Sequence, residues 1–94
     1  MTDTFGTGIL AGKVAFVAGG TRGMNLQIAR RYAEQGAKVA VLSRNQERVD
    51  AAVDELKQIG GEVRGYAGDV RDYDAIDAAM KSTAEELGNV DLVV

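Results

Sequence analysis

The stretch Val14–Asn25, which reads VAFVAGGTRGMN, constrains the fold of this chain more than any other part. An apolar run ends at Ala18, a glycine cluster follows, and a helical pattern begins near Gly23. This order predicts a buried strand, a tight turn and a helix N-terminus. Glycine allows positive φ and close approach of another group, and a helix N-terminus presents unpaired N–H groups. The turn is therefore expected to bind an anion such as a nucleotide phosphate, although similar turns also occur where a chain only reverses direction.

The composition is that of an ordinary globular domain, and it excludes several kinds of site. The chain has 94 residues, 46% hydrophobic and 27% charged, which is enough for one domain or less. A net charge of −3 argues against a nucleic-acid partner. Without cysteine or histidine, these residues supply no disulfide, no thiolate metal site and no histidine base. The start lacks a secretory leader pattern and no apolar run approaches about 18 residues, so we expect a cytoplasmic protein without a membrane partner.

Apolar runs alternate with amphipathic helical patterns along the chain. Strands are expected at residues 13–18, 38–42, 62–67 and 91–94, and helices at 23–35, 46–59 and 73–87. Asn45 and Asp72 are predicted N-caps, and Gly36, Gly60 and Gly88 are predicted helix terminators. The expected inner faces of the helices are Met24, Ile28, Ala29, Tyr32 and Ala33; Val49, Ala52, Val53, Leu56 and Ile59; and Ile76, Ala79, Met80, Thr83 and Leu87. Short connections between these elements predict an α/β fold with a doubly wound parallel sheet between two helical layers.

The last apolar run, Asp91–Val94, begins a strand that nothing in the chain would cover. We therefore expect residues 1–94 to be the first half of a larger doubly wound domain. By themselves these residues are expected to aggregate or to remain loosely packed.

Ligands of doubly wound sheets lie beyond the carboxyl ends of the strands, where three loops of this chain should meet. Proteins that bind NAD usually have an acid about 20 residues after the glycines, which accepts from the ribose 2′-hydroxyl. Ser43 and Arg44 occupy that place here. A cation there suits a 2′-phosphate and hence NADP, and Arg22 could contact the same phosphate. Alternatively, both arginines are solvated loop charges of little energetic consequence.

Three segments resemble the N-terminal half of a short-chain dehydrogenase/reductase: Leu10–Asn25, Ser43-Arg44 and Gly68-Asp69-Val70. The glycine motif of that family is T-G-x-x-x-G-[IL]-G, to which Gly19 and Gly23 correspond, with Met24 in the place of Ile or Leu. The resemblance implies a Rossmann fold that binds NADP through Gly19, Thr21, Arg22, Gly23, Met24, Ser43, Arg44, Asp69 and Val70. Asp69 would bond the adenine amino group and Val70 would offer its backbone to the ring. Asp69 has a second interpretation, as a residue that only turns the chain.

Two positions depart from the family pattern. Ala18 replaces a threonine whose hydroxyl helps to hold the loop, and Asn25 replaces the last glycine. The cofactor would therefore either be displaced slightly or be held by the Asn25 amide. We expect Asn25 to be tolerated rather than required, so that glycine there would leave the fold intact and keep or improve the cofactor affinity.

The resemblance implies an NADP(H)-dependent oxidoreductase that transfers a hydride between nicotinamide and a small carbonyl or alcohol substrate, and that forms a homo-oligomer at full length. The Ser, Tyr and Lys catalytic residues of the family would lie beyond Val94, so residues 1–94 contain none of them. Tyr66 and Tyr73 are expected to be packing residues instead. Two alternatives remain open, namely a non-catalytic NADP(H) sensor and an interaction module with an empty Rossmann fold.

Overall fold

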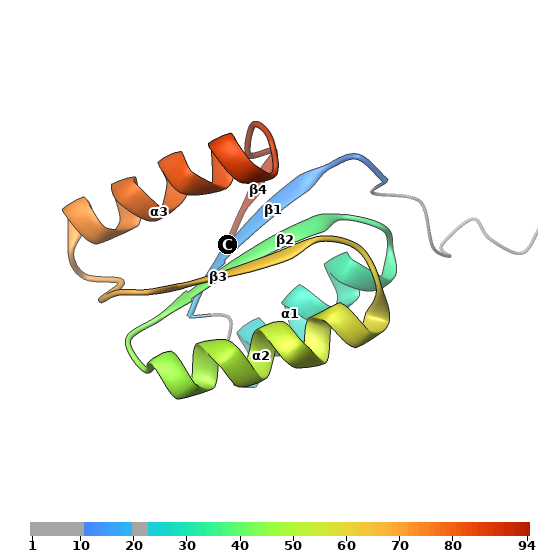
Figure 1. Cartoon of the computed structure of the whole chain (residues 1–94), viewed down its shortest axis with the longest axis horizontal. Coiled ribbons are helices and arrows are strands. Elements are labelled where there is room, and N and C mark those ends of the chain that lie inside the picture. The colour runs from blue at the N-terminus through green and yellow to red at the C-terminus, as the bar shows by residue number, and fades with distance from the viewer. Residues whose placement is uncertain (1–10, 20–22) are drawn as a thin grey trace, which may run out of the picture.

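The computed structural model describes residues 11–19 and 23–94, in which a parallel sheet of four strands carries helices on both faces (Figure 1). The elements are β1 (Val14–Ala18), α1 (Gly23–Glu34), β2 (Lys38–Ser43), α2 (Gln46–Ile59), β3 (Val63–Ala67), α3 (Tyr73–Glu86) and β4 (Leu92–Val93). The strand order is β3-β2-β1-β4, and every neighbouring pair is parallel. The predicted element order and the doubly wound α/β class are confirmed.

The sheet separates two apolar layers. Helices α1 and α2 cover one face, and α3 covers the other (Figure 1). The first layer contains Val17, Ala29, Ala33, Ala37, Val39, Val41, Leu56 and Val63. The second layer contains Val14, Phe16, Ala40, Leu42, Ala79 and Leu87. Strands buried on both faces need apolar residues at consecutive positions, which explains the unbroken apolar runs of β1 and β2.

Local signals define the helix ends. The Asn45 side chain accepts a hydrogen bond from the Arg48 N–H, and the Asp72 side chain accepts from the first turn of α3. The predicted terminators Gly36, Gly60 and Gly88 have φ of 94°, 123° and 114°. These angles favour glycine because a side chain is strained there. The predicted caps and terminators are confirmed.

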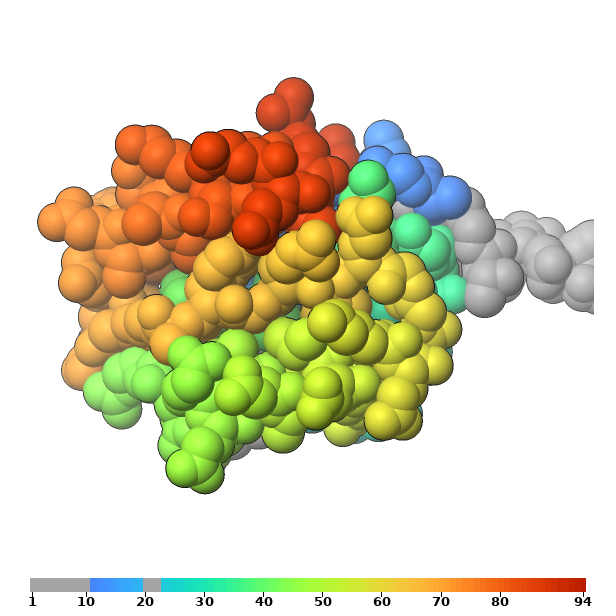
Figure 2. Space-filling view, in the orientation of Figure 1, coloured from blue at the N-terminus to red at the C-terminus, as the bar shows by residue number. Residues whose placement is uncertain are grey.

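The two outer strands of the sheet have different surroundings. Strand β3 runs between α2 and α3 on the face seen in Figure 2. Strand β4 is short, and the side chains of Val93 and Val94 are 63% and 39% exposed. In the described part of the chain, no helix combines the length and the apolar character needed to cross a membrane.

Candidate functional site

The carboxyl ends of β1, β2 and β3 meet at one end of the sheet, on the left in Figure 1. Backbone hydrogen bonds tie these ends together just where the strands become loops. The Gly19 N–H donates to the Leu42 carbonyl at 2.7 Å, and the Gly68 N–H donates to the Ser43 carbonyl at 2.8 Å. The sheet therefore gathers the three loops for which the sequence predicted ligand contacts.

Both described ends of the glycine turn after β1 have backbone angles that favour glycine. Gly19 and Gly23 have φ of 70° and 65°, so a side chain at either position would be strained. A Cβ atom at Gly23 would meet no heavy atom within 4 Å, which leaves space beside the first turn of α1. The predicted contacts of Thr21 and Arg22 lie outside the described residues.

Met24 does not pack where its helical spacing predicts. Its side chain is 78% exposed, whereas Ala29 and Ala33 on the same predicted stripe are buried. Periodicity identifies the face of a helix on which a residue lies, but it does not show whether another element covers that turn. The assignment of Met24 to the inner face was wrong, and its side chain lies open beside the glycine turn.

Asn25 makes a contact that the sequence did not predict. Its Nδ2 atom donates a hydrogen bond of 2.9 Å to the Ala18 carbonyl, across seven residues of chain. The bond joins the end of β1 to the first turn of α1. Asn25 therefore has a hydrogen-bond partner in the protein itself. The expectation that Asn25 is only tolerated did not foresee this contact.

The loops after β2 and β3 bring Arg44 close to Asp69. The Arg44 Nη1 and Asp69 Oδ2 atoms are 3.9 Å apart, and the Arg44 side chain is 68% exposed. Pairs so exposed contribute little to stability, so Arg44 can move toward a ligand at low cost. Val70 follows on the surface, 41% exposed, and Ser43 is half-buried.

Asp69 is held chiefly by Arg71, to which the sequence analysis gave no role. The Arg71 Nε and Nη2 atoms donate to the two carboxylate oxygens at 3.2 and 3.1 Å, and the Arg71 N–H donates to Oδ1 at 2.8 Å. The Arg71 side chain, its backbone N–H and the charge of Arg44 lower the pKa of Asp69. Asp69 also turns the chain, because its carbonyl accepts from the Asp72 N–H. The order Asp-x-Arg after a strand was the signal that could have identified this pair.

The two tyrosines differ from one another. Tyr66 packs against the α3 side of the sheet, and its hydroxyl donates to Glu86 at 2.8 Å. Burial, followed by this hydrogen bond, raises the pKa of Tyr66. Tyr73, the first residue of α3, is 88% exposed, so its assignment as a packing residue was wrong.

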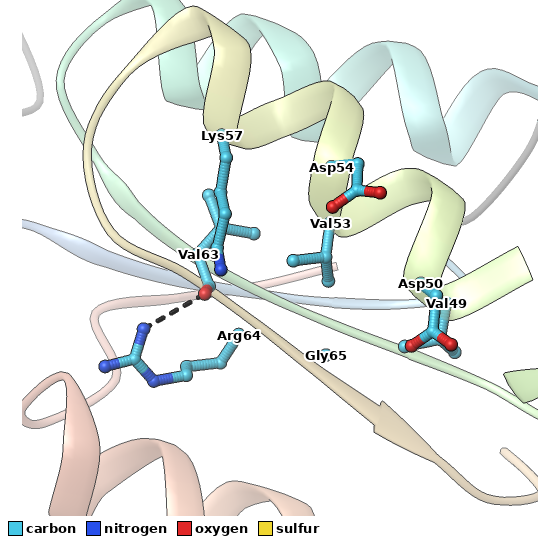
Figure 3. A pocket seen from close by; sticks show the side chains of 8 residues that line it. All are labelled: Val49, Asp50, Val53, Asp54, Lys57, Val63, Arg64 and Gly65. Atoms are coloured by element: carbon cyan, nitrogen blue, oxygen red, sulfur yellow. Dashed lines mark hydrogen bonds between the residues drawn. The ribbon is translucent and has the colours of Figure 1, made fainter.

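A hollow between α2 and β3 lies apart from the loops just described (Figure 3). Its apolar lining is Val49, Val53 and Val63, and its rim carries Asp50, Asp54, Lys57 and Arg64. The Arg64 guanidinium turns away from the hollow to donate to the Val63 carbonyl at 3.1 Å. Across residues 11–19 and 23–94, no three His, Cys, Asp or Glu side chains are grouped closely enough to hold a metal ion.

The sequence model of the short chain dehydrogenases matches residues 13–94, which include every element of the sheet. The chain belongs to the short chain dehydrogenase family. The resemblance carried by the glycine turn, by Ser43-Arg44 and by Gly68-Asp69-Val70 is thereby confirmed at the level of the family.

Individual short chain dehydrogenases agree with this assignment. The chain is 35% identical over 85 residues to 2,3-dihydro-2,3-dihydroxybenzoate dehydrogenase of Bacillus subtilis, covering 90% of this chain and 33% of that protein. L-sorbose reductase from Gluconobacter frateurii, solved with NADPH and L-sorbose, matches with a TM-score of 0.85 and 32% identity over 89% of this chain and 32% of that one. An NAD⁺-bound xylitol dehydrogenase matches with a TM-score of 0.86 and 30% identity over 90% of this chain and 33% of that one. The chain thus spans about a third of the length of the relatives it matches, and these relatives include structures with either nicotinamide cofactor.

Proposed function

We propose that residues 1–94 are the cofactor-binding part of an NADP(H)-dependent oxidoreductase. The rest of that protein would supply the catalytic groups and the pocket for a small carbonyl or alcohol substrate. The bound dinucleotide would donate or accept the hydride. The residues of this chain would hold its adenosine and phosphate groups at the carboxyl ends of β1, β2 and β3.

The position of Arg44 is the observation that carries the proposal. Arg44 directly follows β2. An NAD-binding protein usually has an acidic residue at this place, whereas this chain has Ser43 and Arg44. Its exposed guanidinium lies at the same sheet edge as the glycine turn, so a ribose 2′-phosphate could reach both. A charge-assisted contact to phosphate is worth about 1.5 to 3 kcal/mol, or one to two powers of ten in affinity.

The other site residues would divide the remaining parts of the dinucleotide. The backbone at Gly19 and Gly23, with Thr21 and Met24, would surround the pyrophosphate. Arg22 would join Arg44 at the ribose 2′-phosphate. Asp69 would accept from the adenine amino group, and the Val70 backbone would lie against the ring. The pKa of Asp69 is lowered, which keeps the carboxylate ionised and able to accept.

The test compares NADPH with NADH on the full-length protein by calorimetric titration. We expect NADPH to bind tighter by at least about tenfold, and Arg44→Asp to reverse the preference by removing a cation and adding a repelling charge. Arg31→Asp is the charge-matched control, because Arg31 lies in the last turn of α1, at the opposite end of that helix from the glycine turn. Equal binding of the two dinucleotides by the unmodified protein would refute the NADP assignment.

A further inference from the structure

The hydrogen bond from Asn25 to Ala18 has a defined direction. A carbonyl oxygen only accepts, so the Asn25 atom 2.9 Å away must be the amide nitrogen rather than the amide oxygen. Asn25 is the third residue of α1, and Ala18 is the last residue of β1. One side chain therefore bridges the two elements that flank the glycine turn.

The end of β1 is held on three sides. The Ala18 N–H donates to the Val94 carbonyl at 3.1 Å on the β4 side, and the Gly19 N–H donates to Leu42 at 2.7 Å on the β2 side. The Asn25 amide supplies the third contact, from the helix. It is the contact that joins the strand end to α1 across the turn.

The Asn25 amide also lies against Gly19. A Cβ atom built on Gly19 would be 3.5 Å from Asn25 Nδ2, which is ordinary van der Waals contact. The amide thus packs on the side of Gly19 where a side chain would project. Positive φ at Gly19 and the amide bond to Ala18 together define the path by which the chain leaves β1.

We propose that Asn25 is a positioning residue for the cofactor pyrophosphate. By tying Ala18 to the first turn of α1, its amide fixes the separation of Gly19 and Gly23 before the dinucleotide binds. When Gly19 and Gly23 are held in place in advance, less conformational entropy is lost on binding, which raises affinity without a new contact to the ligand. This inference rests on the proposed binding of NADP(H), and it reverses the expectation that glycine at position 25 would bind equally well.

The experiment uses the full-length protein and two probes, NADPH and 2′-AMP. NADPH contains the pyrophosphate, whereas 2′-AMP carries only the adenosine and the 2′-phosphate that Arg44 would contact. Ordering a group that is loose before binding typically weakens binding by about two- to tenfold. We therefore expect Asn25→Ala to raise the dissociation constant of NADPH about fivefold and that of 2′-AMP by clearly less, because Arg22 is the one residue of the turn proposed to reach the 2′-phosphate.

Two further variants control for effects on folding. Gln27→Ala removes an exposed amide from the same helix and should change neither dissociation constant. Asn25→Gly introduces the residue of the family pattern and provides a second test if Asn25→Ala does not fold. It should weaken NADPH binding at least as much as alanine does, since glycine also loosens the first helical turn. Urea unfolding of each variant identifies the conditions in which all of them are folded.

Three results would overturn the inference. Unchanged NADPH affinity in both Asn25 variants would show that the amide does not position the turn. Equal weakening of NADPH and 2′-AMP would show a general structural role. If the unmodified protein bound neither NADPH nor NADH, the proposed function would fail and this inference with it. If the unmodified protein and both Asn25 variants bound NADPH equally well, the inference alone would be refuted.

Discussion

Among the described glycines, Gly65 is the one where an added methyl group would meet the closest contacts. It lies in β3 directly beneath α2, with Val49 and Val53 above it (Figure 3). A Cβ atom at Gly65 would be 2.5 Å from Val49 Cγ1 and 2.6 Å from Val53 Cγ2. Carbon atoms in contact are normally about 3.5 to 4.0 Å apart, so both methyl groups would have to retreat by about 1 Å.

The cost of Gly65→Ala follows from how these valines can respond. Val49 is 1% exposed, and valine on a helix has one strongly preferred rotamer, so neither side chain turns aside easily. Overpacking of this kind costs about 1 to 3 kcal/mol, while replacing glycine in a strand returns about 0.5 to 1 kcal/mol of backbone entropy. We expect a net loss of about 1 to 2 kcal/mol in the free energy of unfolding.

A double-mutant cycle in urea measures whether the clash causes this loss. Val53 is only half-buried, so Val53→Ala removes one of the two clashing methyl groups at moderate cost. In that background Gly65→Ala should cost about half as much, with the m-value unchanged. An unchanged or increased stability of Gly65→Ala alone would refute the reasoning, as would a cost that does not depend on Val53.

Three further predictions follow from the described contacts. Arg71→Ala should raise the pKa of Asp69, measured by carboxyl NMR titration. Because folding lowers the pKa of Asp69, its ionised carboxylate contributes stability above the pKa that it has in the unfolded chain. That contribution is lost as the pH falls below about 4. The variant should therefore lose less stability in acid than the unmodified protein does. Asn45→Ala should reduce the free energy of unfolding by about 0.5 to 2 kcal/mol in urea, because the Arg48 N–H loses its cap; no change would show that the cap is dispensable. The 94-residue chain by itself should self-associate through the exposed side of β4 in analytical ultracentrifugation, and Val93→Lys should reduce the association; a monodisperse monomer with a cooperative melt would contradict this.

The order of elements could be predicted from the sequence because its signals are local. Apolar runs define β1 and β2, and cap residues such as Asn45 and Asp72 act within a few residues of their own position. The meeting of Arg44 and Asp69 could also be predicted, because the carboxyl ends of adjacent parallel strands lie at the same edge of a sheet. The affinities of the candidate site residues for NADP(H) stay predictions, and Thr21 and Arg22 lie outside the described residues.

The sequence by itself determined which segments are strands and helices, where most helices begin and end, and to which family the glycine turn belongs. Only the tertiary structure decided which side chains meet across elements. Periodicity placed Met24 on an inner stripe that is buried at Ala29 and Ala33 but exposed at Met24. Nothing in the sequence marked Gly65 as the place where α2 packs against β3. The bond from Asn25 to Ala18 likewise depends on how α1 is set against the end of β1. Such contacts depend on the distances between packed elements, which local propensity and spacing do not specify.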